Sequence, residues 1–309
     1  GPLGEKLLAY WGILGDKTTA VIEMAASSGL LLVPTAERNP LITTTFGLGE
    51  LIKTALDRGC KKLIVGIGGS ATNDGGAGMA QALGVKLLDK EGNSLPFGGK
   101  ALSQLKKIDI SQLDSRLKNT EVVVACDVDN PLTGLKGASH IYGPQKGATP
   151  EMVLELDEAL KHFANIISQE LRIEVNDVEG AGAAGGLGAG LMAFLDGQLT
   201  SGIQLVMDTV QLEKHLKDCD FVLTGEGKLD AQSAFGKVPV GVARLAKKYD
   251  VPVVVLAGSV AEDANKLHTE GITAFFSIIP TPVTLAEAIE NTEKLLEEAV
   301  SQVYRLITC

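Results

Sequence analysis

The chain has 309 residues, of which 45% are hydrophobic and 4% aromatic, and it carries 36 glycines and a formal net charge of −10. This length and apolar content suit two α/β domains, each with its own core. The acidic excess argues against general contact with nucleic acid or with an anionic membrane surface, because the long-range field repels both.

Strand-like and helix-like runs alternate along the chain. The first two thirds predict strands over 18–25, 61–67 and 121–127 and helices over 47–59, 78–84 and 149–171, the last with Thr149 as N-cap and Pro150 in its first turn. The last third predicts strands over 220–225, 251–258 and 274–279 and helices over 238–250 and 285–307. This alternation is typical of largely parallel sheets with helices on both faces.

A glycine-rich loop joins the strand and the helix of "KKLIVGIGGSATNDGGAGMAQALG", residues 61–84. Six glycines fall within residues 66–78. The backbone N–H groups of Gly68, Gly69 and Ser70 are expected to face the space beyond the strand end. The dipole of the following helix adds partial positive charge there. The loop is therefore predicted to bind a substrate or its phosphate.

The same loop carries a carboxylate, Asp74, preceded by Asn73, and no lysine or arginine. A carboxylate would repel bare phosphate, so Asp74 is expected to act through Mg²⁺ or to accept a proton from a substrate hydroxyl. The structural alternative is that Ser70, Thr72 and Asp74 cap the helix. Capping does not explain the number of glycines, which favours the functional interpretation.

Two further stretches place oxygen ligands and charges beyond predicted strands. "CDVDNPLTG" (126–134) puts Asp127, Asp129 and Asn130 where ligands of open α/β sheets bind, and such oxygens suit Mg²⁺. An Asx turn before Pro131 is the alternative. Near the helix that Thr149 caps, Lys146 is positioned to bind an anion.

The stretch "TGEGKLDAQSAFGKVPVG" (224–241) combines Glu226, Lys228, Asp230, Ser233 and Lys237 in one predicted strand-to-helix loop. Lysine can neutralise a transferring phosphoryl group, and a carboxylate can hold a metal or orient a hydroxyl. A solvated loop of mixed charge is the alternative.

"GAGAAGGLGAG" (180–190) has the GxGxxG spacing of a dinucleotide site. The preceding "IEVNDVE" is too polar for the buried strand that such a site requires. We interpret the stretch as close helix packing and a bend near a domain boundary, or as a glycine-lined wall beside a ligand.

The long motifs together resemble the bacterial glycerate kinase type 1 family. They are "AVIEMAASSGL", "VGIGGSATNDGGAGM", "ACDVDNPL", "GASHIYGPQKGA", "GAGAAGGLGAGLMAF" and "VLTGEGKLDAQSAFGKVPVGVA", and the resemblance covers nearly the whole chain. It implies phosphorylation of D-glycerate by ATP and Mg²⁺ to 2-phosphoglycerate, in glycolate or glucarate breakdown. It also implies two α/β domains with largely parallel sheets, one inserted in the other, and a ligand site in the interdomain cleft.

The expected domains are an inserted α/β domain over 1–198 and a doubly wound, flavodoxin-like domain over 199–309. Family members begin earlier, with an "APDSFK"-like loop and a "DGGEGT"-like motif that these residues do not contain. We therefore expect the family's N-terminal segment, including one strand of the second domain, to be missing from this sequence.

The expected site residues follow from these motifs and the resemblance. The catalytic candidates are Asp74, Asp127, Glu226, Asp230 and Lys237, with the identity of the base left open. Substrate or phosphate binding is assigned to Gly68, Gly69, Ser70, Asn73, Lys146, Lys228 and Ser233, and metal binding to Asp127 and Glu226.

Two other functions remain open: a nicotinamide-dependent oxidoreductase that uses a glycine-rich loop, and a non-catalytic fragment that binds small anions. D-Glycerate and ATP are the expected partners, without nucleic acid or membrane, and a homo-oligomer is left open. The widely spaced Cys60, Cys126, Cys219 and Cys309 are typical of reduced thiols in a cytoplasmic protein.

Overall fold

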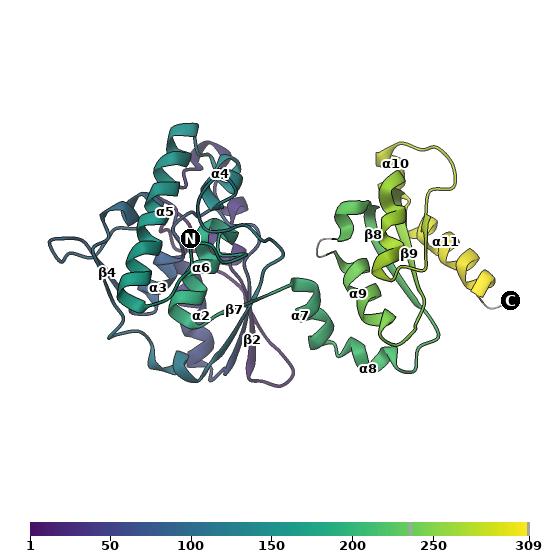
Figure 1. Ribbon diagram of the computed structural model, residues 1–309, viewed down its shortest axis with the longest axis horizontal. Coiled ribbons are helices and arrows are strands. Elements are labelled where there is room, and N and C mark those ends of the chain that lie inside the picture. Colours follow the sequence, from purple (N-terminus) through teal and green to yellow (C-terminus); the bar gives the residue numbers. More distant parts are fainter. Residues whose placement is uncertain (235–236, 308–309) are drawn as a thin grey trace. The chain divides into compact units, whose positions relative to one another are not determined.

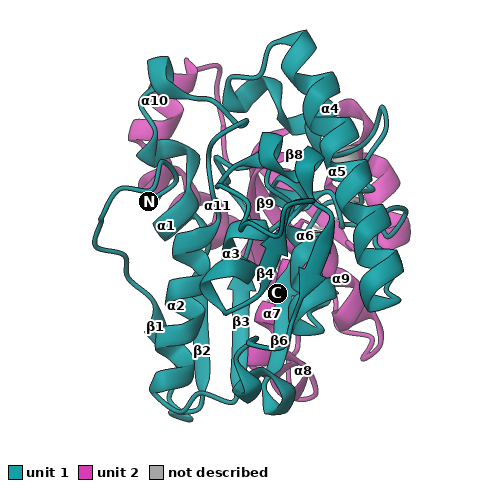
Figure 2. Cartoon of the chain, turned by 90° about the vertical axis from the view of Figure 1, so that its left-hand side faces the viewer, with its two compact units in different colours: residues 1–200 teal, residues 201–309 magenta. Residues whose placement is uncertain are grey.

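The protein is described by a computed structural model that covers residues 1–234 and 237–307 (Figure 1). It divides into two compact units, unit 1 over residues 1–200 and unit 2 over residues 201–309 (Figure 2). Cys309 and two residues of the 224–241 stretch, Phe235 and Gly236, lie outside the described residues. Unit 1 holds one large hydrophobic core, and unit 2 holds two smaller ones, on the two faces of its sheet.

Unit 1 is built on a five-stranded sheet in the order β1-β2-β3-β6-β7. Neighbours from β2 to β7 pair in parallel, whereas β1 pairs antiparallel with β2. The parallel pairs bring the C-terminal ends of these strands to one edge of the sheet. The strands are β1 (Gly12–Ile13), β2 (Thr19–Glu23), β3 (Lys62–Gly66), β6 (Glu121–Ala125) and β7 (Gln198–Thr200).

The helices predicted over 47–59, 78–84 and 149–171 are present as α2, α3 and α5, whereas α1, α4 and α6 were not predicted. The side chain of Thr149 accepts a hydrogen bond from the backbone N–H of Met152, so the predicted N-cap is confirmed. A two-stranded antiparallel sheet, β4 (Lys86–Leu88) with β5 (Lys107–Asp109), is an addition that the sequence did not predict. The helices are α1 (Ala25–Ser28), α2 (Phe46–Asp57), α3 (Ala77–Ala82), α4 (Ala138–Tyr142), α5 (Pro150–Leu171) and α6 (Ala183–Leu195).

The glycine-rich stretch 180–190 lies inside unit 1 and not at its boundary, and it forms the first half of α6. Three successive residues there, Ala184, Gly185 and Gly186, have left-handed backbone conformations. The backbone packs so closely that a Cβ at Gly185 would lie 2.0 Å from the carbonyl oxygen of Thr72. Residues 172–182, which precede α6, contain no strand, so the strand-turn-helix unit of a dinucleotide site is absent from this stretch.

Unit 2 contains a parallel three-stranded sheet in the order β10-β9-β8, with the predicted strands extended or shifted by a few residues. Apolar positions on the two faces of β9 pack into separate cores, Val253 and Val255 into one and Val254 and Leu256 into the other. Its elements are α7 (Gly202–Thr209), α8 (Leu212–Leu216), β8 (Val222–Leu229), α9 (Val238–Lys247), β9 (Val253–Val260), β10 (Ala274–Ser277), α10 (Leu285–Glu290) and α11 (Thr292–Ile307).

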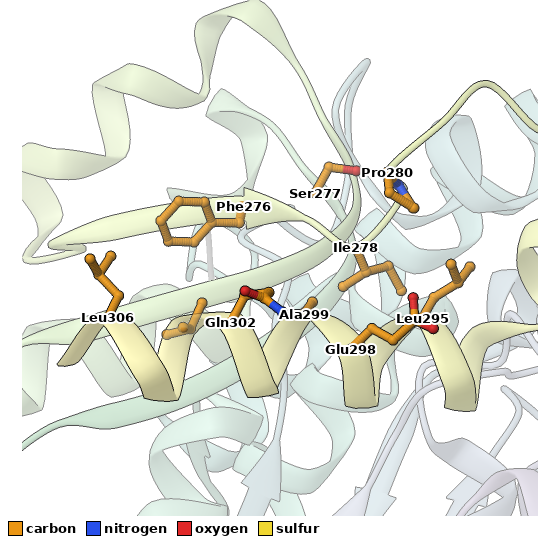
Figure 3. A pocket seen from close by; sticks show the side chains of 10 residues that line it. Phe276, Ser277, Ile278, Pro280, Leu295, Glu298, Ala299, Gln302 and Leu306 are labelled. Atoms are coloured by element: carbon orange, nitrogen blue, oxygen red, sulfur yellow. The ribbon is translucent and has the colours of Figure 1, made fainter. Parts of the chain in front are cut away.

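The prediction of one helix over 285–307 is wrong, because α10 ends at Glu290 and α11 begins at Thr292. Asn291 between them has φ −99° and donates a side-chain hydrogen bond to the carbonyl of Glu287, a local bond that competes with helix continuation. An apolar groove of about 420 Å³ runs between β10 and α11 (Figure 3). In the described part of the chain, no helix is both long and apolar enough to cross a membrane.

The close packing at Gly185 predicts a strong effect of Gly185→Ala on stability. The new methyl group would meet the Thr72 carbonyl as well as requiring a left-handed alanine. Gly92→Ala is the matched control, because Gly92 has φ +86° and open space around its Cβ position. In urea unfolding, we expect Gly92→Ala to lower the free energy of unfolding by about 1–2 kcal/mol. Gly185→Ala should lower it by roughly 3 kcal/mol or more, because overpacking adds to the backbone strain. Equal losses of unfolding free energy in the two variants would contradict the close approach of Gly185 to the Thr72 carbonyl.

Candidate active site

A cavity of about 400 Å³ lies in unit 1 at the C-terminal ends of β3 and β6. The loop after β3 and the loop after β6 form two walls, and the left-handed start of α6 forms a third. Five of the predicted site residues line it, so the structure brings together Gly68, Gly69, Ser70, Asp127 and Lys146. The other lining residues are Leu30, Ile67, Ala125, Cys126, Val128, Tyr142, Gln145, Ala183 and Ala184.

Lys146 is the cation of this cavity, and its side chain is almost completely buried, with 1% of its surface exposed. Its Nζ donates a hydrogen bond to the carbonyl oxygen of Thr72 at 2.7 Å. Burial lowers the pKa of Lys146 to about 7, and the negative charge of Asp74 acts in the opposite direction. An amine held in this way is suited to an anionic ligand, which would supply the missing counter-charge.

Asp74 does not line the cavity and has no exposed surface. Its carboxylate accepts hydrogen bonds from the backbone and hydroxyl of Thr45, at 2.8 and 2.9 Å, and from the N–H groups of Gly76 and Gly78, at 3.2 Å each. Burial raises the pKa of Asp74, while these four bonds oppose that rise. The contacts favour the capping interpretation, in which Asp74 ties the start of α3 to the segment before α2.

Asn73, which precedes Asp74, is also buried. Its Nδ2 donates to the hydroxyl of Ser139 on α4 at 3.0 Å, so it joins the glycine-rich loop to the helix beside the cavity. Within the described residues, Asn73 Oδ1 and the hydroxyl oxygen of Thr72 are buried without a hydrogen-bond partner. Such atoms normally accept from water or a ligand.

The loop after β6 is held by side-chain contacts that position Asp127. The Tyr142 hydroxyl donates to Asn130 Oδ1, and Asn130 Nδ2 donates to the Lys136 carbonyl at 2.8 Å. Cys126, at the strand end, contacts the carbonyl of Val128 through its sulfur at 3.3 Å. Tyr142 and Cys126 line the cavity but were not predicted as site residues. Their position in the resembling motifs "ACDVDNPL" and "GASHIYGPQKGA" was the available signal.

In unit 2, the predicted residues Lys228, Asp230, Ser233 and Lys237 gather between the end of β8 and the start of α9. Asp230 lies between the two lysines, 3.3 Å from Lys228 Nζ and 3.8 Å from Lys237 Nζ, and 3.2 Å from the Ser233 hydroxyl. Burial alone would raise the pKa of Asp230, but the hydrogen bond from Lys228 and the charge of Lys237 outweigh it and lower that pKa. Glu226 lies on β8 and bonds the N–H of Gly227.

A metal site of protein ligands alone is not formed in the described part of the chain, where no group of three or more His, Cys, Asp or Glu side chains could hold an ion. The predicted metal ligands Asp127 and Glu226 belong to different units. Each of the two supplies one carboxylate, and Mg²⁺ usually binds through one or two carboxylates together with water and substrate phosphates.

The contacts of Asp74 predict that Asp74→Asn lowers stability. An amide group in place of one carboxylate oxygen would direct its own N–H toward a backbone N–H, which costs about 1–3 kcal/mol. Asp129→Asn is the control, because that residue is exposed on the loop after β6. Thermal melts of both variants measure the difference. A parental melting temperature combined with turnover reduced 100-fold would instead support the predicted role of Asp74 as general base.

Comparison with known proteins places this chain in a family. A sequence profile of the glycerate kinase family matches residues 1–308. The glycerate 2-kinase of Escherichia coli (strain K12) is 58% identical over 94% of this chain and 76% of the relative. The glycerate kinase of Bacillus subtilis (strain 168) is 55% identical over 98% of this chain and 79% of the relative.

Solved structures agree with the sequences. A crystal structure of a protein from Salmonella typhimurium LT2 has a TM-score of 0.89 and 51% identity, covering 100% of this chain and 80% of that one. The mixed α/β fold with mostly parallel sheets is thus shared with that protein. The resemblance seen in the sequence is confirmed, and the chain belongs to the glycerate kinase family.

Proposed function

We propose that the protein transfers a phosphoryl group from ATP to D-glycerate and forms 2-phosphoglycerate. The observation that carries this proposal is the 58% identity to a glycerate 2-kinase over 94% of the chain. The choice of the 2-hydroxyl rests on that relative. The cavity of unit 1 supports an acid as substrate, because its buried cation is Lys146.

The two sets of residues suit different parts of the reaction. In the cavity, Lys146 would pair with the glycerate carboxylate, and the backbone of Gly68 and Gly69 would allow the ligand to approach closely. In unit 2, Lys228 near the end of β8 and Lys237 at the N-terminus of α9 would contact phosphate oxygens and offset the charge of the transferring group. The first assignment rests on residues of unit 1 alone, and the second rests on residues of unit 2 alone.

We propose Asp127 as the general base that accepts the proton of the attacking hydroxyl. Of the four candidate acids, Asp127 is the one whose residue lines the cavity. Asp74 is saturated with hydrogen bonds, and Asp230 is paired with two lysines. Glu226 stays a candidate metal ligand on β8. When bound with ATP, Mg²⁺ would neutralise phosphate charge, and with Asp127 acting as the base, Glu226 would hold it.

The proposed activity predicts ADP release that depends on D-glycerate and on Mg²⁺. In a coupled assay, turnover should vanish with excess chelator and return when Mg²⁺ is restored, since ATP phosphates need the cation for transfer. Titration with NAD(H), followed by fluorescence, is the matched test for the oxidoreductase alternative. Binding of NAD(H) without ADP release would contradict the kinase. Binding of D-glycerate without any ADP release would favour the non-catalytic fragment.

The position of Lys237 predicts that Lys237→Ala reduces catalysis more than stability. Its Nζ lies 3.3 Å from the Lys228 carbonyl, and its side chain is partly exposed, so little packing is lost. A lost contact to the transferring phosphoryl group should reduce kcat about 100- to 1000-fold. Lys294→Ala, at a more exposed lysine on α11, is the control and should match the parent. An unchanged kcat with a lowered melting temperature would refute the catalytic role.

A further inference from the structure

Lys146 has more hydrogen-bonding capacity than its surroundings use. A protonated amine carries three N–H donors, and within the described residues its recorded acceptor is the Thr72 carbonyl oxygen. The side chain is 1% exposed, so bulk water does not serve the remaining donors. The residue lines a cavity large enough for a small organic acid. The amine can therefore bond further acceptors that a ligand in the cavity would supply.

The charges around Lys146 do not compensate it fully. Asp74, on the loop after β3, attracts the ammonium form, but its oxygens already accept four hydrogen bonds from other groups. The exposed carboxylate of Asp127 lies on the loop after β6. Burial raises the pKa of both Cys126 and Tyr142, so these cavity residues are neutral near pH 7.

Other ionisable groups lie on the segments around Lys146. His140 on α4, the helix that precedes Lys146, interacts with Asp157 of α5. Asp157 in turn accepts a hydrogen bond from the N–H of Gly134 at 3.0 Å. The backbone of Arg38 packs against Gly147, the residue after Lys146. A Cβ at Gly147 would lie 2.3 Å from the carbonyl oxygen of Arg38. A ligand carboxylate would thus add a second negative charge to that of Asp74, and it would offer acceptors to the N–H donors of Lys146 that do not bond the Thr72 carbonyl.

We propose that the unit 1 cavity takes up one proton, on Nζ of Lys146, together with its anionic ligand. This inference rests on the proposed function, because it takes D-glycerate as that ligand. In the empty cavity, burial favours the neutral amine, and the pKa of Lys146 is about 7. A bound carboxylate favours the ammonium form and raises that pKa. Above neutral pH, binding and protonation are then linked, and affinity falls as the pH rises.

Isothermal titration of D-glycerate into the protein, in paired buffers of different ionisation heat, counts the protons taken up. The D-glycerate carboxyl, with a pKa near that of other α-substituted acids at about 3.5, stays ionised throughout, so protons that are taken up bind the protein. We expect uptake near zero at about pH 6, roughly half a proton at about pH 7 and close to one at about pH 8.5. Above pH 7, the Kd should rise about tenfold per pH unit.

Variants assign the proton to Lys146. Lys146→Arg keeps its charge at every pH tested, so it should bind D-glycerate without proton uptake. Lys146→Met should bind more weakly, also without uptake. Lys161→Met removes an exposed lysine on α5 and should take up protons as the parent does. Thermal melts establish that each variant is folded. If the Lys146 variants do not fold, the proton uptake of the parent protein across the pH series tests the proposal.

The outcomes separate this inference from the proposed function. Binding of D-glycerate with no pH-dependent uptake, or with uptake that persists in Lys146→Arg, overturns the proton linkage and leaves the kinase intact. An absence of D-glycerate binding at every pH overturns both. Uptake that disappears in Lys146→Arg and persists in Lys161→Met supports the linkage.

Discussion

The contact between two glycine-rich backbones is the constraint on which the rest of unit 1 depends. The N–H of Gly75 donates to the carbonyl of Gly185 at 3.0 Å, and a Cβ at Gly190 would lie 2.4 Å from the carbonyl oxygen of Gly75. Side chains on either segment would force the two apart. The approach fixes the loop after β3 against α6, and it thereby sets where the Thr72 carbonyl stands. Lys146 bonds that carbonyl, so the position of the buried amine follows from a contact made without side chains.

Asp74 and Lys146 show how burial gives two charged groups opposite consequences. Four donors surround the Asp74 carboxylate, and their hydrogen bonds offset part of its desolvation within the protein. The surroundings of Lys146 leave donors without acceptors, and that deficit faces a cavity. A buried polar group that makes all of its hydrogen bonds contributes to rigidity. One that has hydrogen bonds still to make can bind a ligand that completes them. The same loop contains the Asp74 anchor and, through Thr72, one contact of the binding group.

Local patterns predicted the elements that local interactions determine. The β3 strand, α3 and the cap of α5 at Thr149 all carry their signals within a few residues. The break at Asn291 lies in the polar run 290–294, and it escaped prediction because Ile289 and Leu296 on either side keep the seven-residue spacing of one helical face. The short strand β7 depends on pairing with β6, which lies far away in sequence. Tertiary contacts decide such elements, and single-segment propensities do not contain them.

The site residues also divide into those whose place local patterns predict and those whose surroundings depend on tertiary contacts. Gly68, Gly69 and Asp127 line one cavity because parallel strands deliver their C-terminal ends to a common edge, whereas Lys146 reaches that cavity from the segment between α4 and α5. The environment of Asp74 could not be foreseen, since it depends on Thr45, which comes from another segment. Whether a carboxylate is open to a ligand or enclosed by donors is a property of the folded packing and not of the residue type.

The glycine and alanine walls of the cavity also limit how its substrate range can change during evolution. Gly68 and Gly69 have no side chain, so substitutions there can only reduce the space, and Ala183 and Ala184 can release at most one methyl group each, by change to glycine. Room for a bulkier acid must come from the larger lining residues, such as Leu30, Tyr142 and Gln145. Of these, Tyr142 also holds Asn130, so its truncation would loosen the loop that carries Asp127. Substitutions that narrow the substrate range are therefore available at many of the lining positions, whereas few lining positions allow substitutions that widen it.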